Sequence, residues 1–132
     1  MITRRQLDVN ARDTYVITSI QSAAVTDRVV GICPVRSQLI KVYETHGTAS
    51  DATQTLSIER LQGTETSGNG DAVVNATIDL EGTANTVQEG TVVTTSDIHI
   101  FEAGDRVGTN VSATGTAVAS MIVTLQFRPV DD

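Results

Sequence analysis

Short runs in which apolar and polar residues alternate follow one another along most of the chain, separated by segments rich in Gly, Asn, Asp and Ser. Alternation with a period of two places apolar side chains on one face of a strand, and short strands at this spacing are typical of β-sandwiches and barrels. The pattern predicts about eight strands in an antiparallel β-sandwich. They are expected at residues 14–21, 28–33, 38–45, 54–61, 72–80, 92–101, 106–113 and 118–128.

The alternation is clearest in the segments 72–80 and 118–128, where one face is apolar. An antiparallel sheet with one face on the core and one in solvent has this pattern. Val73, Ile122 and Tyr43 fall on the opposite faces, where they are expected to expose apolar surface. The residues expected to face the core are Val74, Ile78, Leu80, Met121, Val123 and Leu125.

The first 13 residues show no sustained alternation, so we expect an N-terminal arm (residues 1–13) outside a single sandwich domain (residues 14–132). The arm is locally cationic in an acidic chain, and it also carries the apolar side chains of Ile2, Leu7 and Val9. Arginine forms bidentate contacts with carboxylates, so the arm is predicted to bind a neighbouring subunit or a shell protein. The alternative is a frayed, solvated terminus. The predicted contact residues are Arg4, Arg5, Leu7, Val9 and Arg12.

Composition supports the strand prediction and indicates which residue types fill the core. Threonine and valine occur 20 and 17 times in 132 residues, and β-branched residues favour pleated, half-buried surfaces. Aromatic residues make up only 3% of the chain, so the core is expected to be aliphatic. Because Trp and Tyr supply much of the energy of sugar stacking and of protein hot spots, a carbohydrate-binding module is disfavoured.

Charge and cysteine content exclude several classes of partner. A net charge of −7 repels the phosphate backbone, so nucleic acid is not an expected partner. No run approaches the roughly 20 apolar residues of a membrane span, so no membrane partner is expected. Cys33 is the single cysteine; it cannot form an intrachain disulfide and is expected to be a small buried hydrophobe.

The sequence contains no recognisable catalytic or metal-binding motif, so we expect no enzyme activity, no metal and no cofactor. His46 and His99 are the two histidines, and no HExxH or CxxC spacing is present. His46, beside Gly47, is expected in a loop, and His99, between two isoleucines, is expected at a solvent-facing or edge position of a strand. The acidic and amide residues considered for calcium match no EF-hand spacing and are expected to be solvated loop groups. They are Asn69, Asp71, Asp79 and Asp97.

The second half of the chain carries a family resemblance. The segments IHIFEAGDRV (residues 98–107) and ASMIVTLQFRP (residues 119–129) resemble the end of tailed-phage virion jelly rolls, including head decoration, or cement, proteins. The resemblance spans roughly residues 39–129 and implies a Gly-Asp turn before the penultimate strand and a final strand that closes the sandwich. Its motif is shared by capsid, fibre and tail modules.

The resemblance implies a non-enzymatic virion protein. The favoured hypothesis is a capsid decoration protein on the capsid exterior that binds the major capsid protein or another virion protein, forms a homotrimer and stabilises the shell. The alternative is a receptor-binding or fibre-tip module that recognises a host-surface glycan or protein. A small β-sandwich enzyme is the third possibility, and the sequence offers it no triad or metal site.

Overall fold

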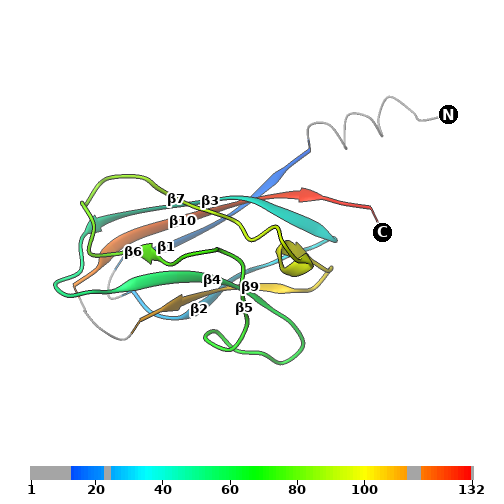
Figure 1. Ribbon diagram of the computed structural model, residues 1–132, viewed down its shortest axis with the longest axis horizontal. Coiled ribbons are helices and arrows are strands. Elements are labelled where there is room, and N and C mark those ends of the chain that lie inside the picture. Colours follow the sequence, from blue (N-terminus) through cyan, green and yellow to red (C-terminus); the bar gives the residue numbers. More distant parts are fainter. Residues whose placement is uncertain (1–12, 23–24, 113–116, 132) are drawn as a thin grey trace.

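Two antiparallel β-sheets pack face to face in the computed structural model, which describes residues 13–22, 25–112 and 117–131 (Figure 1). The fold is an all-β sandwich of jelly-roll type, which confirms the predicted fold class. Sheet A consists of β1 (Tyr15–Gln21), β3 (Ser37–Thr48), β7 (Gln88–Gly90), β8 (Ile100–Phe101) and β10 (Ala119–Pro129). Sheet B consists of β2 (Arg28–Ile32), β4 (Thr55–Leu61), β5 (Asp71–Ala72), β6 (Ile78–Asp79) and β9 (Arg106–Val111).

The strand order of sheet A is β1-β10-β3-β7, with β8 also pairing with β3. That of sheet B is β2-β9-β4-β5, with β6 also pairing with β4. The described residues thus form ten strands where about eight were expected, because four of the ten are only two or three residues long. β1 begins and β10 ends at the same end of the sandwich (Figure 1).

The core lies between the sheets and is built by the alternation that the sequence shows. In β10, alternate residues from Met121 to Phe127 are fully buried, while Ile122 between them is 38% exposed. All of the residues predicted to face the core are buried, namely Val74, Ile78, Leu80, Met121, Val123 and Leu125. The burial of large aliphatic side chains is the main favourable term in the stability of such a domain.

The expected strand at residues 72–80 is wrong, and Val73 is fully buried instead of exposed. Val73 and its neighbour Val74 are both buried, which a regular strand with alternating faces does not allow. The chain leaves sheet B after Ala72 and forms a bridge from Val74 to Val92. The backbone N–H of Val73 bonds the carbonyl of Ile58 in sheet B (2.9 Å). Residues 73–75 therefore cross the side of the sandwich instead of extending a sheet.

The expected strand at residues 92–101 is also wrong over most of its length. Val92 forms only the isolated bridge, Asp97–His99 form a 3-10 turn (η1), and β8 is limited to the last two residues. His99 is partly exposed on this turn, and its Nδ1 lies 2.9 Å from the Ser96 carbonyl oxygen. Among the described residues, no helix is long and apolar enough to span a membrane.

The Gly-Asp turn implied by the resemblance is present at residues 102–105 and leads into β9. The N–H of Asp105 bonds the Glu102 carbonyl (2.9 Å), and the Asp105 carboxylate accepts from the N–H of Glu102 (2.8 Å). Gly104 has φ +91°, a conformation that favours glycine. Its N–H bonds the Cys33 carbonyl (2.8 Å), so the turn is fixed to the end of β2.

Candidate interaction surfaces

A buried pair of ionisable side chains lies on the inner face of β3. Glu44 and His46 both have fully buried side chains, and Glu44 Oε2 lies 2.7 Å from His46 Nδ1. Gln88 Nε2 donates to Glu44 Oε1 (2.9 Å), and His46 Nε2 lies 3.0 Å from the Gly82 carbonyl oxygen. The prediction of His46 as a loop residue is wrong, because β3 continues to Thr48 and turns the imidazole toward the core.

The partners of His46 favour its charged form. Both ring nitrogens face acceptors, a carboxylate and a carbonyl, so an imidazole that satisfies both carries two protons. Burial alone lowers the pKa of His46, but the hydrogen bonds to the Gly82 carbonyl and the Glu44 carboxylate, with the charges of Glu44 and Asp79, outweigh it. The pKa of His46 is therefore raised. Since neither side chain is exposed to solvent, the pair is part of the interior of the domain and is not accessible to a substrate.

Cys33 is fully buried at the end of β2, as predicted. Burial raises the pKa of its thiol to about 11 and that of the neighbouring Tyr15 hydroxyl to about 12. The Tyr15 hydroxyl donates to Ser37 Oγ (2.6 Å). A cysteine nucleophile requires the thiolate form, so this environment does not support a catalytic role.

Cys33 is expected to be unreactive toward a thiol reagent in the native protein at pH 7. With a thiol pKa of about 11, only about one molecule in 10⁴ carries the thiolate, and none of its surface is exposed. The reaction should appear only when urea unfolds the chain. Native protein with Thr18→Cys, which adds a thiol at an exposed position, is the matched positive control. A fast reaction of Cys33 in the folded parent chain would contradict this assignment.

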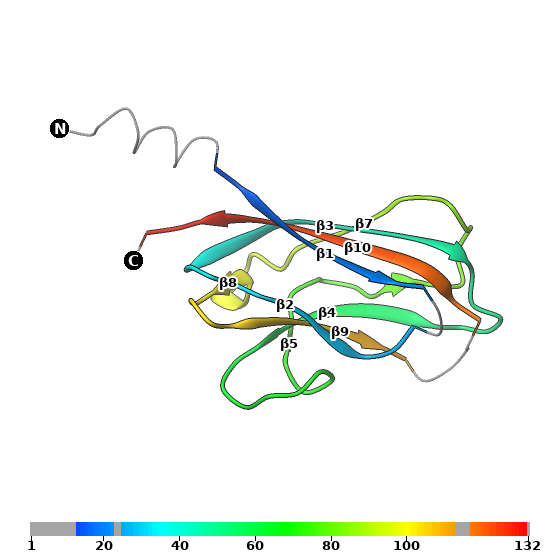
Figure 2. The ribbon, with the colours of Figure 1, turned by 180° about the vertical axis from the view of Figure 1, so that it is seen from behind.

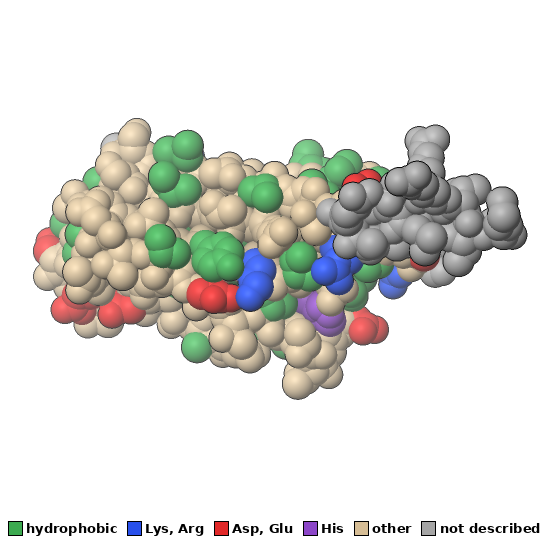
Figure 3. All heavy atoms as spheres, turned by 90° about the horizontal axis from the view of Figure 1, so that it is seen from above, with side chains coloured by type: hydrophobic (Ala, Val, Ile, Leu, Met, Phe, Trp, Pro, Cys, Tyr) green, Lys and Arg blue, Asp and Glu red, His purple; other side chains and the backbone are tan. Residues whose placement is uncertain are grey.

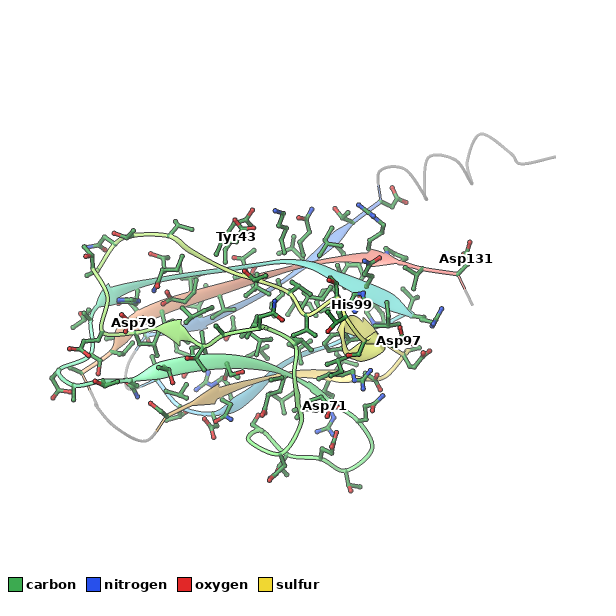
Figure 4. All side chains as sticks on the ribbon, viewed as in Figure 1. Tyr43, Asp71, Asp79, Asp97, His99 and Asp131 are labelled. Atoms are coloured by element: carbon green, nitrogen blue, oxygen red, sulfur yellow. The ribbon has the colours of Figure 1, made fainter. Side chains whose placement is uncertain are left out.

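The candidate calcium ligands do not gather in one place (Figure 4). Asp71 pairs with Arg60 (3.1 Å), and Asp79 Oδ1 accepts from the N–H of Glu81 (2.8 Å). Asn69 bonds Thr66 within its loop (2.8 Å), and Asp97 lies on the 3-10 turn. The described residues contain no group of three or more His, Cys, Asp or Glu side chains suited to a metal ion.

An open cavity of about 310 Å³ lies between β6 and β7, on the side of the sandwich opposite β1. Residues 75–79 and 88–91 line it. Its two carboxylates already have partners, because Asp79 bonds the chain at Glu81 and Glu89 pairs with Lys41 (2.9 Å). Its lining contains no serine, cysteine or histidine.

The outer face of sheet A is a broad surface with few charges (Figure 3). The register places Ile122 between Ile20 and Thr45, and Thr124 between Thr18 and Tyr43. Ile20 is 66% and Ile122 38% exposed, so the predicted exposure of Ile122 is confirmed, whereas Tyr43 is only partly exposed. Within this face, Lys41 and Glu89 compensate each other (2.9 Å).

The outer face of sheet B is partly covered by the loop 62–70. Glu59 and Leu61 point to this face and are still buried, with exposed fractions of 4% and 0%. The Gly68 N–H donates to Glu59 Oε1 (2.7 Å). A Cβ on Gly108 would lie 2.8 Å from Leu61 and 3.0 Å from Ser67, so the loop packs closely on the sheet. Among the described residues, sheet A is the one with an uncovered outer face.

The predicted arm contacts Arg4, Arg5, Leu7, Val9 and Arg12 lie outside the described residues. The described chain starts at Asp13, directly before β1, at the end of the sandwich where β10 also ends (Figure 1). Sequence reasoning did not identify the buried Glu44–His46 pair. Their positions two residues apart, on the same face of β3 as Val42, were the signal that would have placed them inward.

No protein-family model matches the chain, and no curated protein matches it in sequence. Solved structures do match. A chain of the capsid of Ralstonia phage GP4 matches with a TM-score of 0.62 and 18% identity, over 90% of this chain and 84% of that chain. One from the capsid asymmetric unit of cyanophage Pam1 has a TM-score of 0.50 and 15% identity, over 89% of this chain and 84% of that chain. At these identities the similarity is one of fold: the chain shares its β-sandwich with chains of phage capsids.

Proposed function

We propose that this chain is a non-enzymatic virion structural protein that decorates the outside of a phage head and stabilises the shell. The observation that carries the proposal is the match to a chain of the Ralstonia phage GP4 capsid over 90% of this chain. A match over 90% of the chain extends well beyond a single hairpin. The Gly-Asp turn and the closing strand β10 agree with the same role.

The open outer face of sheet A supports this role. A decoration protein needs a broad contact with an assembled lattice, and this face presents Ile20, Ile122 and a row of threonines with one compensated ion pair. A protein that binds the assembled shell better than free subunits shifts the equilibrium toward the intact shell by mass action. The chain would act at the head as a homotrimer, in line with the decoration proteins it resembles.

The test is add-back to particles assembled from a genome in which the coding sequence of this chain is deleted. Purified chain should bind these particles, raise the temperature at which the shell disrupts, and appear in cryo-electron microscopy as density on the shell exterior with three-fold symmetry. Density at a tail tip would instead favour the receptor-binding alternative. Density on the exterior as isolated single copies would contradict the homotrimer but leave the decoration role in place.

Deletion of residues 1–12 is expected to leave the sandwich folded and to weaken attachment to the particle, because the two sheets are built from residues 13 onward. Arg4→Glu with Arg5→Glu should weaken binding by several-fold or more. The physical reason is the loss of one or two charge-assisted hydrogen bonds, each about 1.5–3 kcal/mol. Particle occupancy at a series of protein concentrations measures the effect.

The matched control makes the same change in net charge away from sheet A, at three exposed positions: Arg28→Glu with Thr64→Glu and Thr83→Glu. If the arm variant and this control lose the same occupancy, the effect is one of net charge and not of the arm. Parent-level occupancy of the deleted chain would show that the arm is a passive tail.

A further inference from the structure

β1 is an edge strand without the features that usually prevent strand addition. Among the residues that the structure describes, it ends sheet A and pairs with β10 alone. Its seven residues, YVITSIQ, contain no charge, no proline and no irregularity in register. Natural proteins usually protect edges by shortness, charge, proline or bulges.

The other edges of the described sheets have that protection. β7 has three residues, and β5 and β6 have two each. β2 carries Arg28 and a register shift between Val29 and Gly31. β1 alone combines length, regularity and neutral side chains, and Figure 2 shows it along the near side of the molecule.

We propose that β1 is a contact between two copies of this chain, which pair antiparallel about a two-fold axis through Thr18. Thr18 is the midpoint of β1, so this register uses all seven residues of both strands. It places Thr18 opposite Thr18 of the second copy, and Val16 opposite Ile20. Threonines that lie directly opposite each other form favourable pairs, and Val16 and Ile20 would each remove apolar surface of the other from water.

The pattern of exposure fits this pairing. Val16 is 54% and Ile20 66% exposed on the outer face of sheet A, and each would be covered by the other. Ile122 lies beside Ile20 in the register, so the joined sheets would carry a continuous apolar strip across the contact. Two copies with a net charge of −7 each repel at most surfaces, and β1 is a strand that brings no charged side chains together.

This contact is independent of the role in the virion. A two-fold contact cannot close a trimer, since a trimer requires a head-to-tail contact between two different surfaces. If the chain also forms trimers at a shell, β1 would link neighbouring trimers. The pairing can therefore be tested on the purified full chain alone.

Disulfide trapping tests the register. Residues directly opposite in an antiparallel pair lie within disulfide reach, so Thr18→Cys should give a two-chain band under mild oxidation. Val16→Cys alone should give none, because Val16 lies opposite Ile20, and two copies of Val16 are about 13 Å apart along the strands. A mixture of Val16→Cys and Ile20→Cys chains should link to each other. Cys33 is buried and does not compete.

Two control measurements are made on each variant. A urea transition like that of the parent chain would show that the variant is folded, and reaction with a thiol reagent would show that the new cysteine is accessible. Equal linking of Val16→Cys to itself and of Thr18→Cys to itself would indicate random collision and overturn the proposal. So would the absence of any link through an accessible Thr18→Cys. Thr18→Lys, which places two cations opposite each other, should also shift the sedimenting species toward smaller mass, whereas Thr45→Lys on β3 should not.

Discussion

Replacement of either member of the Glu44–His46 pair is expected to lower the free energy of unfolding by about 3–5 kcal/mol, the range found when one partner of a buried ion pair is removed. His46→Leu leaves the Glu44 carboxylate buried with Gln88 as its remaining side-chain partner. Glu44→Leu leaves the imidazole without its acceptor at 2.7 Å. Urea denaturation of the two variants measures the loss.

The double variant Glu44→Leu with His46→Leu distinguishes the energetic contribution of the ion pair from that of the volume its side chains occupy. Replacement of both partners by apolar groups is often neutral or stabilising, so the double variant should be more stable than either single variant. Thr45→Ala, at the position between them on the outer face of β3, is the control and should change stability by about 0.5 kcal/mol or less. Strictly additive losses would show that the two side chains do not act as a pair.

The same pair gives stability a defined pH dependence. The pKa of His46 is raised in the folded chain, above the value of about 6.5 for an unfolded histidine. The folded state therefore binds the proton more tightly than the unfolded state does. The stabilisation is fully present below pH about 6.5 and is lost as the pH rises through the folded pKa. In the same urea measurement, the stability of His46→Leu should not fall in this way as the pH rises above about 6.5.

Six strands follow the predicted positions closely, although β2 and β4 do not alternate regularly between buried and exposed residues. In β10 every second residue from Met121 to Phe127 reaches the core, and in β3 the same period runs from Val42 to His46, so alternation was enough to predict these strands. The segment 72–80 misled because Val74, Ile78 and Leu80 alternate and are buried. Alternate side chains are also buried in a segment that crosses the side of the sandwich, so the local pattern does not distinguish such a segment from a regular strand.

The Glu44–His46 pair was missed for a different reason. Gly47 beside His46 suggested a loop, whereas β3 continues through it to Thr48 as the partner of β10. Ala119 of β10 lies opposite Thr48, so the pairing with a distant strand decides where β3 ends. The partners come from distant parts of the chain: Gly82 lies 36 positions after His46, and Gln88, the first residue of β7, lies 44 positions after Glu44. No short-range pattern brings these groups together.

Three of the four aromatic side chains of the protein form one cluster at the end of the sandwich near both termini. The ring of Phe127 stacks on Tyr15 (centroids 5.3 Å apart) and meets Phe101 edge-on (5.2 Å). Phe127 and Phe101 are fully buried. The cluster joins β1, β8 and β10, and Tyr15 lies two residues after Asp13, where the predicted arm meets the sandwich.

Phe127→Ala is therefore expected to lower the free energy of unfolding by about 3–5 kcal/mol, the usual loss for a buried phenylalanine. That is a large part of the about 5–15 kcal/mol that stabilises a typical domain. Phe127→Leu keeps most of the volume and should lose less. Val87→Ala, at a side chain 67% exposed, should change stability by no more than about 0.5 kcal/mol.

Because Tyr15 would lose its stacking partner, the amide hydrogens of β1 should exchange faster in Phe127→Ala than those of β4, which lies in the other sheet. Uniform acceleration of exchange in both strands would indicate global destabilisation without a local role of the cluster at the base of the arm.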